Sequence, residues 1–127
     1  MTSPRAFLAW SWTASILALC WFPRSLMPVK EAGPGPIGIP HLDKVVHFGL
    51  FAVFALLWAR ATGHQLRRVF LAGCGLAILT ELGQMVPVVG RDAGLDDGLA
   101  DVVGVAAGLG AYLLSRRIGI KAPTPMA

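Results

Sequence analysis

Charged residues are scarce in this sequence. Asp, Glu, Lys and Arg make up 14% of its 127 residues, whereas an ordinary soluble domain carries about 25%. Hydrophobic residues make up 55%, and the mean hydropathy is +0.64. The few charges are clustered, so that long uncharged runs separate them. This composition excludes a typical soluble domain and indicates a single integral membrane domain over residues 1–127.

Several motifs of other protein classes are also missing. The net charge of +4 is scattered, without the basic stripe and interleaved aromatics of a nucleic-acid-binding domain, so no nucleic-acid partner is expected. The only two cysteines, Cys20 and Cys74, fall on opposite sides of the expected membrane. A disulfide between them is therefore not expected, and we interpret both as small buried residues. No serine or cysteine accompanies the polar residues described below, which leaves a nucleophilic triad without support.

Four apolar runs predict an all-α bundle of four transmembrane helices, at residues 6–22, 43–61, 69–89 and 97–114. The first run follows a short basic head, so a signal peptide is the alternative, but we favour a retained helix. Five prolines and three glycines interrupt residues 23–40 and predict a loop. The tail, residues 118–127, is expected to be flexible. The second and fourth runs are short, and must include their polar first turns or lie in a thinned bilayer.

The distribution of Lys and Arg predicts the orientation. With the N-terminus inside, the loops and ends on the inner side carry seven cations and those on the outer side carry four. The positive-inside rule therefore favours cytoplasmic termini and a multi-pass protein of the cell membrane. The inner cations are Arg5, Arg60, Arg67, Arg68, Arg116, Arg117 and Lys121, and the outer ones are Arg24, Lys30, Lys44 and Arg91.

This topology gathers the polar residues of the helices at the outer end of the bundle. An ionisable residue at a bilayer centre costs about 2.5–3.5 kcal/mol, so a chain that keeps one usually pairs or uses it. On the last helix, Gly104 and Gly108 share a face with Asp101, and their spacing lets a neighbouring helix approach closely. The polar set is Asp43, Lys44, His47, Glu81, Gln84, Arg91, Asp97 and Asp101.

The order and spacing of these residues resemble the VanZ-like family of small integral membrane proteins. The matching pattern is Asp43-Lys44-x-x-His47-Phe48, Glu81-x-x-Gln84, Arg91 and Asp97-x-x-Ala100-Asp101-x-x-Gly104. Asp101 departs from the pattern, because the family has Asn there, and it adds a carboxylate. The resemblance implies a four-helix protein of the bacterial cell envelope, and the family's namesake is linked to teicoplanin resistance.

Three functions remain open for the polar set, and the sequence does not decide whether the protein is an enzyme. In the first, pairs such as His47 with Asp43, and Glu81 with Arg91 or Lys44, only join helices, at about 1 kcal/mol each. In the second, an outward-facing pocket binds an envelope precursor or lipid. There Lys44 and Arg91 would hold its phosphate or carboxylate, and His47 and Glu81 would form an acid/base pair if chemistry occurs on a lipid-linked substrate.

The third function is a divalent-metal site. His47, Glu81, Asp97 and Asp101 offer imidazole and carboxylate ligands, although no His-x-x-x-His motif is present. No other cofactor is expected. The partners that the sequence predicts are the lipid bilayer and an envelope precursor or lipid ligand.

Overall fold

The computed structural model describes residues 3–26, 41–91 and 93–119. Within these residues the chain forms four α-helices and one short 3-10 helix, and no strand. The prediction of an all-helical fold with four helices is therefore confirmed. The loop predicted at 23–40 lies outside the described residues from 27 onward, as do Asp92 and the tail from 120. The helices are α1 (Pro4–Cys20), η1 (Arg24–Leu26), α2 (Leu42–Thr62), α3 (Leu66–Gln84) and α4 (Leu95–Arg117).

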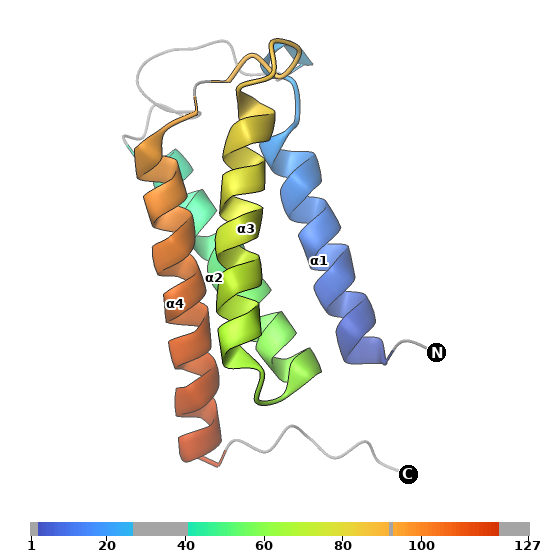
Figure 1. Cartoon of the computed structure of the whole chain (residues 1–127), viewed down its shortest axis with the longest axis vertical. Helices are drawn as coiled ribbons and strands as arrows, with labels where there is room; N and C mark the ends of the chain where they lie inside the picture. Colours follow the sequence, from blue (N-terminus) through green and yellow to red (C-terminus); the bar gives the residue numbers. More distant parts are fainter. Residues whose placement is uncertain (1–2, 27–40, 92, 120–127) are drawn as a thin grey trace.

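The four helices run alternately in opposite directions, so α2 and α4 point the same way (Figure 1). One end of the bundle holds the ends of α1 and α3 and the starts of α2 and α4. We call it the polar end, because it carries His47, Glu81 and Asp101. The opposite end, which we call the basic end, carries Arg5, Arg60, Arg67, Arg68, Arg116 and Arg117.

The helix boundaries differ from the predicted ones for local reasons. α1 begins at Pro4, two residues early, because Ser3 caps it by accepting a hydrogen bond from the amide of Ala6, and proline suits the first helical turn. α3 ends at Gln84, five residues short of the predicted end. Pro87 accounts for this, because proline lacks an amide donor and disfavours helical geometry in the residue before it.

α2 makes its most extensive contact with α4 rather than with its neighbours in sequence. A Cβ added at Gly104 would collide with the carbonyl oxygen of Phe48, and one at Gly108 would collide with that of Ala52. The two helices therefore touch through their backbones, as small residues allow in membrane proteins. This contact sets the register between the two helices, that is, which residue of α4 lies opposite which residue of α2.

Tryptophan side chains join α1 to α2. The indole N–H of Trp12 donates to the carbonyl of Leu50 at 2.9 Å, and that of Trp58 donates to the hydroxyl of Thr13 at 3.0 Å. Between the helices lies an apolar core to which all four contribute. It consists of Ile16, Cys20, Phe51, Phe54, Ala55, Val69, Leu76, Ala77 and Val105.

The outer surface of the bundle is unusually apolar. Among the described residues, α2 and α4 are the two helices that are long and apolar enough to cross a membrane, judged by length and composition. α1 and α3 are shorter, with 17 and 19 residues, but they also expose large apolar side chains, such as Phe7 at 67% and Ile78 at 62%. Soluble monomers rarely expose such surface over a wide area. Cys20 and Cys74 are both free thiols, as predicted, but only Cys20 is buried, and the prediction that Cys74 is buried as well was wrong, because it is half-buried.

Candidate functional site

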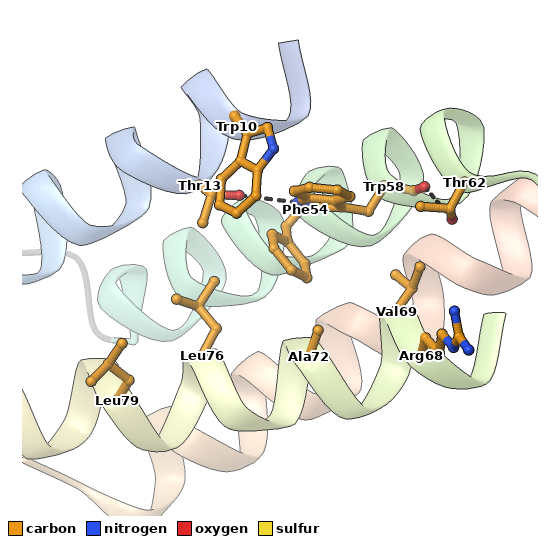
Figure 2. Close-up of a pocket in the computed structure, with 10 residues that line it drawn as sticks. All are labelled: Trp10, Thr13, Phe54, Trp58, Thr62, Arg68, Val69, Ala72, Leu76 and Leu79. Atoms are coloured by element: carbon orange, nitrogen blue, oxygen red, sulfur yellow. Dashed lines mark hydrogen bonds between the residues drawn. The ribbon is translucent and has the colours of Figure 1, made fainter. Parts of the chain in front are cut away.

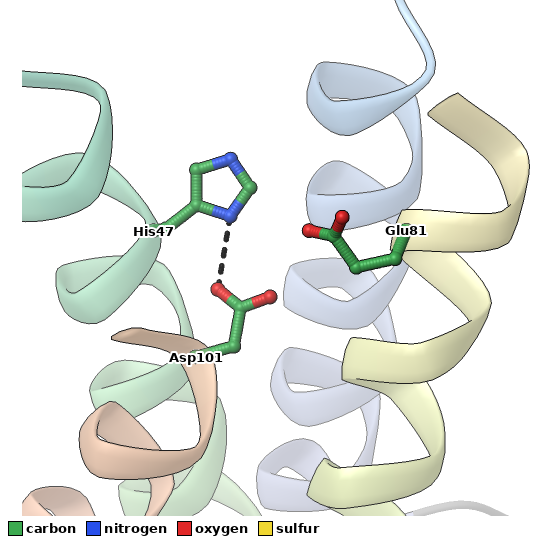
Figure 3. Close-up of side chains that lie close together, drawn as sticks. All are labelled: His47, Glu81 and Asp101. Atoms are coloured by element: carbon green, nitrogen blue, oxygen red, sulfur yellow. Dashed lines mark hydrogen bonds and ion pairs between the residues drawn. The ribbon is translucent and has the colours of Figure 1, made fainter. Parts of the chain in front are cut away.

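Three ionisable side chains meet inside the polar end, each from a different helix (Figure 3). His47 comes from the second turn of α2, Glu81 from the last turn of α3, and Asp101 from the second turn of α4. One ligand-capable atom from each side chain lies within 4.8 Å of the other two. We call these three residues the polar triad.

The centre of the polar triad is a buried hydrogen bond. His47 donates from Nδ1 to Oδ1 of Asp101 at 2.9 Å, and the two residues are 6% and 0% exposed. The other carboxylate oxygen of Asp101 and Oε1 of Glu81 are buried, and among the described residues neither has a hydrogen-bond partner. A buried acceptor without a donor costs about 1–3 kcal/mol. The polar triad is therefore not a satisfied structural network.

The other polar residues that the sequence singled out lie around the polar triad with partners of their own. Lys44 pairs with Asp96 at 3.5 Å on the surface, and Arg91 donates to the carbonyl of Leu19 at 3.3 Å. Gln84 donates to the carbonyl of Cys20 at 3.5 Å. The pairs predicted for a purely structural role were therefore wrong, because Lys44 and Arg91 are engaged away from Glu81.

Two further carboxylates stay outside the polar triad. Asp43 was the predicted partner of His47, but His47 bonds to Asp101 on α4 instead. Asp43 is half-buried in the first turn of α2. Asp97, a predicted metal ligand, is half-buried in the first turn of α4 and does not belong to the group of ligand atoms found among the described residues.

Comparison with known proteins gives one match. A sequence model of the VanZ/LLP1 family matches residues 5–116, which include nearly all of the four helices. The chain belongs to the VanZ/LLP1 family. The resemblance drawn from the polar residues is thus confirmed, and family membership together with the two apolar helices indicates a membrane protein. No curated protein and no solved structure matches the chain.

The structure of this VanZ/LLP1 protein contains a second feature, an apolar cleft of about 430 Å³ between α1, α2 and α3 (Figure 2). It extends from Thr62 and Arg68 near the basic end to Leu79, and no residue of the polar triad lines it. The sequence reasoning missed it, because its walls come from three helices whose relative positions no single helix encodes. The lining residues are Trp10, Thr13, Phe54, Trp58, Thr62, Arg68, Val69, Ala72, Leu76 and Leu79.

The polar groups of the cleft already have partners. Thr13 accepts from the Trp58 indole, and the Thr62 hydroxyl donates to the carbonyl of Trp58 at 2.8 Å. Arg68 donates to the side-chain oxygen of Gln65 at 2.9 Å. The remaining surface is aliphatic and aromatic, with Trp10 edge-on to Trp58 at a centroid distance of 5.0 Å. The interior of the cleft therefore offers a ligand apolar contact and few hydrogen bonds.

Proposed function

We propose that this VanZ/LLP1 protein is a multi-pass protein of the bacterial cell membrane, with four spanning helices and cytoplasmic termini. The apolar side chains exposed on α1 and α3 support lipid contact for those helices as well as for α2 and α4. The clustering of arginines at the basic end supports the orientation, because cytoplasmic loops carry the excess of Lys and Arg. In this orientation the polar triad lies near the outer surface.

Within that topology, we propose that the protein binds an anionic membrane lipid, with one acyl chain in the apolar cleft. The observation that carries this proposal is the cleft itself. Its volume of about 430 Å³ falls in the range of about 300–1,000 Å³ typical of ligand pockets. An apolar cavity whose polar groups are already paired provides few hydrogen bonds to water, so a hydrocarbon chain is the better occupant.

Arg68 favours a lipid with a negatively charged headgroup. It lines the cleft from the third residue of α3, at the depth where a headgroup would lie in the proposed orientation. Its partner Gln65 is neutral, so the charge of the guanidinium is not cancelled by that bond. A guanidinium binds phosphate oxygens in pairs, and anionic lipids are enriched in the cytoplasmic leaflet.

The polar end is less suited to a large organic ligand. His47 and Asp101 are almost fully buried. Lys44 pairs with Asp96 and Arg91 donates to the carbonyl of Leu19, so neither cation is directed at the polar triad. We therefore place the acyl-chain site of a lipid or lipid-linked envelope precursor in the cleft. Through this binding we propose a role in the cell envelope, with tolerance to teicoplanin-type antibiotics as the phenotype to measure.

Lipid binding can be tested on the full-length protein purified in mild detergent. Native mass spectrometry would count bound phosphatidylglycerol and phosphatidylcholine for the wild type and for variants. Ala72→Phe fills the cleft and should weaken binding by about tenfold or more, whereas Ile78→Phe, on the exposed face of α3, should not. Arg68→Gln should remove the preference for phosphatidylglycerol, and Arg67→Gln is its control. Equal lipid binding by Ala72→Phe and the wild type would refute the proposal.

A further inference from the structure

The polar triad contains two buried carboxylate oxygens that lack a hydrogen-bond donor or a cation. Oδ2 belongs to Asp101, which has no exposed surface, and Figure 3 shows it turned toward Glu81. The carboxylate group of Glu81 points toward the same space, and its Oε1 is also buried without a partner among the described residues. Carboxylates kept inside a membrane helix bundle usually pair with one another, with a cation or with a water-filled cavity. The Nδ1 proton of His47 is donated to Oδ1 of Asp101 and satisfies neither of these two oxygens.

The spacing of the three side chains suits a metal ion. In zinc sites the nitrogen and oxygen ligands lie about 2.0–2.2 Å from the ion, which separates them from one another by about 3.3–3.5 Å. The ligand atoms of the polar triad all lie within 4.8 Å of one another. Rotations of the side chains that move these atoms by about 1 Å would bring all three onto one ion. For Nδ1 of His47 to bind the ion, the proton that it shares with Asp101 would move to Nε2, so that the imidazole stays neutral.

The charges of the polar triad select the kind of ion. Two carboxylates and a neutral imidazole balance a divalent cation to a net charge of zero, which a low-dielectric site favours. The imidazole nitrogen favours first-row transition metals over Mg²⁺ and Ca²⁺, which prefer oxygen ligands alone. We propose that His47, Glu81 and Asp101 form a binding site for a divalent first-row transition-metal ion, such as Zn²⁺ or Mn²⁺. This inference is independent of lipid binding, because none of these three residues lines the cleft.

Glu81 is the member of the polar triad that reaches the surface. It is half-buried, whereas His47 and Asp101 have almost no exposed surface. A Cβ added at Gly98, in the first turn of α4, would lie 3.7 Å from Cγ of Glu81, an ordinary contact distance, so α4 lies directly beside this side chain. A metal site needs an access path as well as its ligands. Once bound, the ion would connect α2, α3 and α4.

The test uses the full-length protein in detergent, stripped of metal with a chelator that is then removed. Zn²⁺ and Mn²⁺ are titrated separately by calorimetry, and melting temperature is followed in parallel. We expect one ion per chain and a higher melting temperature, with no comparable rise for Mg²⁺ or Ca²⁺. Co²⁺ should give visible absorption bands, which report imidazole and carboxylate ligands independently of any activity.

Isosteric variants distinguish the polar triad from adventitious sites. Removing a residue that only hydrogen-bonds to a metal ligand typically lowers metal affinity about 10–100-fold. Glu81→Gln and Asp101→Asn each remove a ligand itself, so each should lower the affinity by about 100-fold or more. The control is Asp96→Asn, which removes a carboxylate from the same end of α4 where it pairs with Lys44 at the surface. This variant should bind metal like the wild type.

Two results would overturn the proposal. One is a wild-type protein that melts at the same temperature with the chelator and with Zn²⁺ or Mn²⁺, which would leave the polar triad as a metal-free helix contact. The other is metal binding that survives both substitutions, which would place the ion elsewhere. If Asp101→Asn does not fold, Glu81→Gln decides alone, because Glu81 is only half-buried and glutamine keeps its shape.

Discussion

The backbone contact between α2 and α4 makes Gly108 the position where one methyl group should disturb the bundle most. A Cβ at Gly108 would collide with the carbonyl oxygen of Ala52 and would lie 2.9 Å from Cβ of Ala55. Carbon atoms in contact are normally about 3.5–4.0 Å apart, so α2 and α4 would have to separate by about 1 Å. Backbone atoms and a methyl group cannot turn aside as a long side chain could.

A second glycine on α4 allows the magnitude of this effect to be isolated. Gly110 has no atom within 4 Å of the position that an added Cβ would occupy, so Gly110→Ala should show only the preference of helices for alanine, about 0.5–1 kcal/mol of stabilisation. Gly108→Ala has the same intrinsic gain but also the overpacking cost, about 1–3 kcal/mol. We therefore expect Gly108→Ala to be less stable than Gly110→Ala by about 1–3 kcal/mol.

Reversible unfolding in mixed micelles with increasing SDS, followed by circular dichroism, would give the free energy of unfolding for each variant. Gly108→Leu should be less stable still, because its side chain is larger. If Gly108→Ala proves as stable as Gly110→Ala, the face of α4 that contains Gly108 does not pack against α2, and the reasoning is wrong.

Three further results are expected. A reporter fused after Arg117 should be active only in the cytoplasm, and activity outside the membrane would contradict the proposed topology. Glu81→Gln should melt close to the wild type yet lose any teicoplanin tolerance that the protein confers, and full tolerance would favour a structural role. Thr13→Val should destabilise the protein by about 1–3 kcal/mol, measured by SDS unfolding, because it removes the acceptor of the Trp58 indole. In that assay, Thr13→Val combined with Trp58→Phe should lose less than the sum of the single variants, and simple additivity would exclude the bond.

The number and approximate extent of the helices could be predicted because each apolar run carries its own signal. A run long enough to bury itself in lipid needs no information from its neighbours. The exact ends depended on single residues, and two of these signals were legible in the sequence. Ser3 followed by Pro4 marks the start of α1, and Pro87 marks where α3 can no longer continue.

The identity of the residues at the polar end could also be predicted, but not which of them touch. His47 and Asp101 are 54 positions apart, and their hydrogen bond depends on the register of α2 against α4. Gly104 and Gly108 set that register through backbone contact. Helical periodicity relates residues within one helix only, which is why Asp43 was the predicted partner of His47. The apolar cleft could not be predicted for the same reason.

The pairing of α2 with α4 also governs the order in which the protein can assemble. Chains are made from the N-terminus, so α2 leaves the ribosome before its principal partner exists. Until the 23 residues of α4 follow, the imidazole of His47 lacks its hydrogen-bond partner Asp101, and the carbonyl of Ala52 lacks its contact with Gly108. We expect a nascent chain stalled before Leu95 to remain loosely packed. Completion of the bundle therefore depends on the last helix to be synthesised.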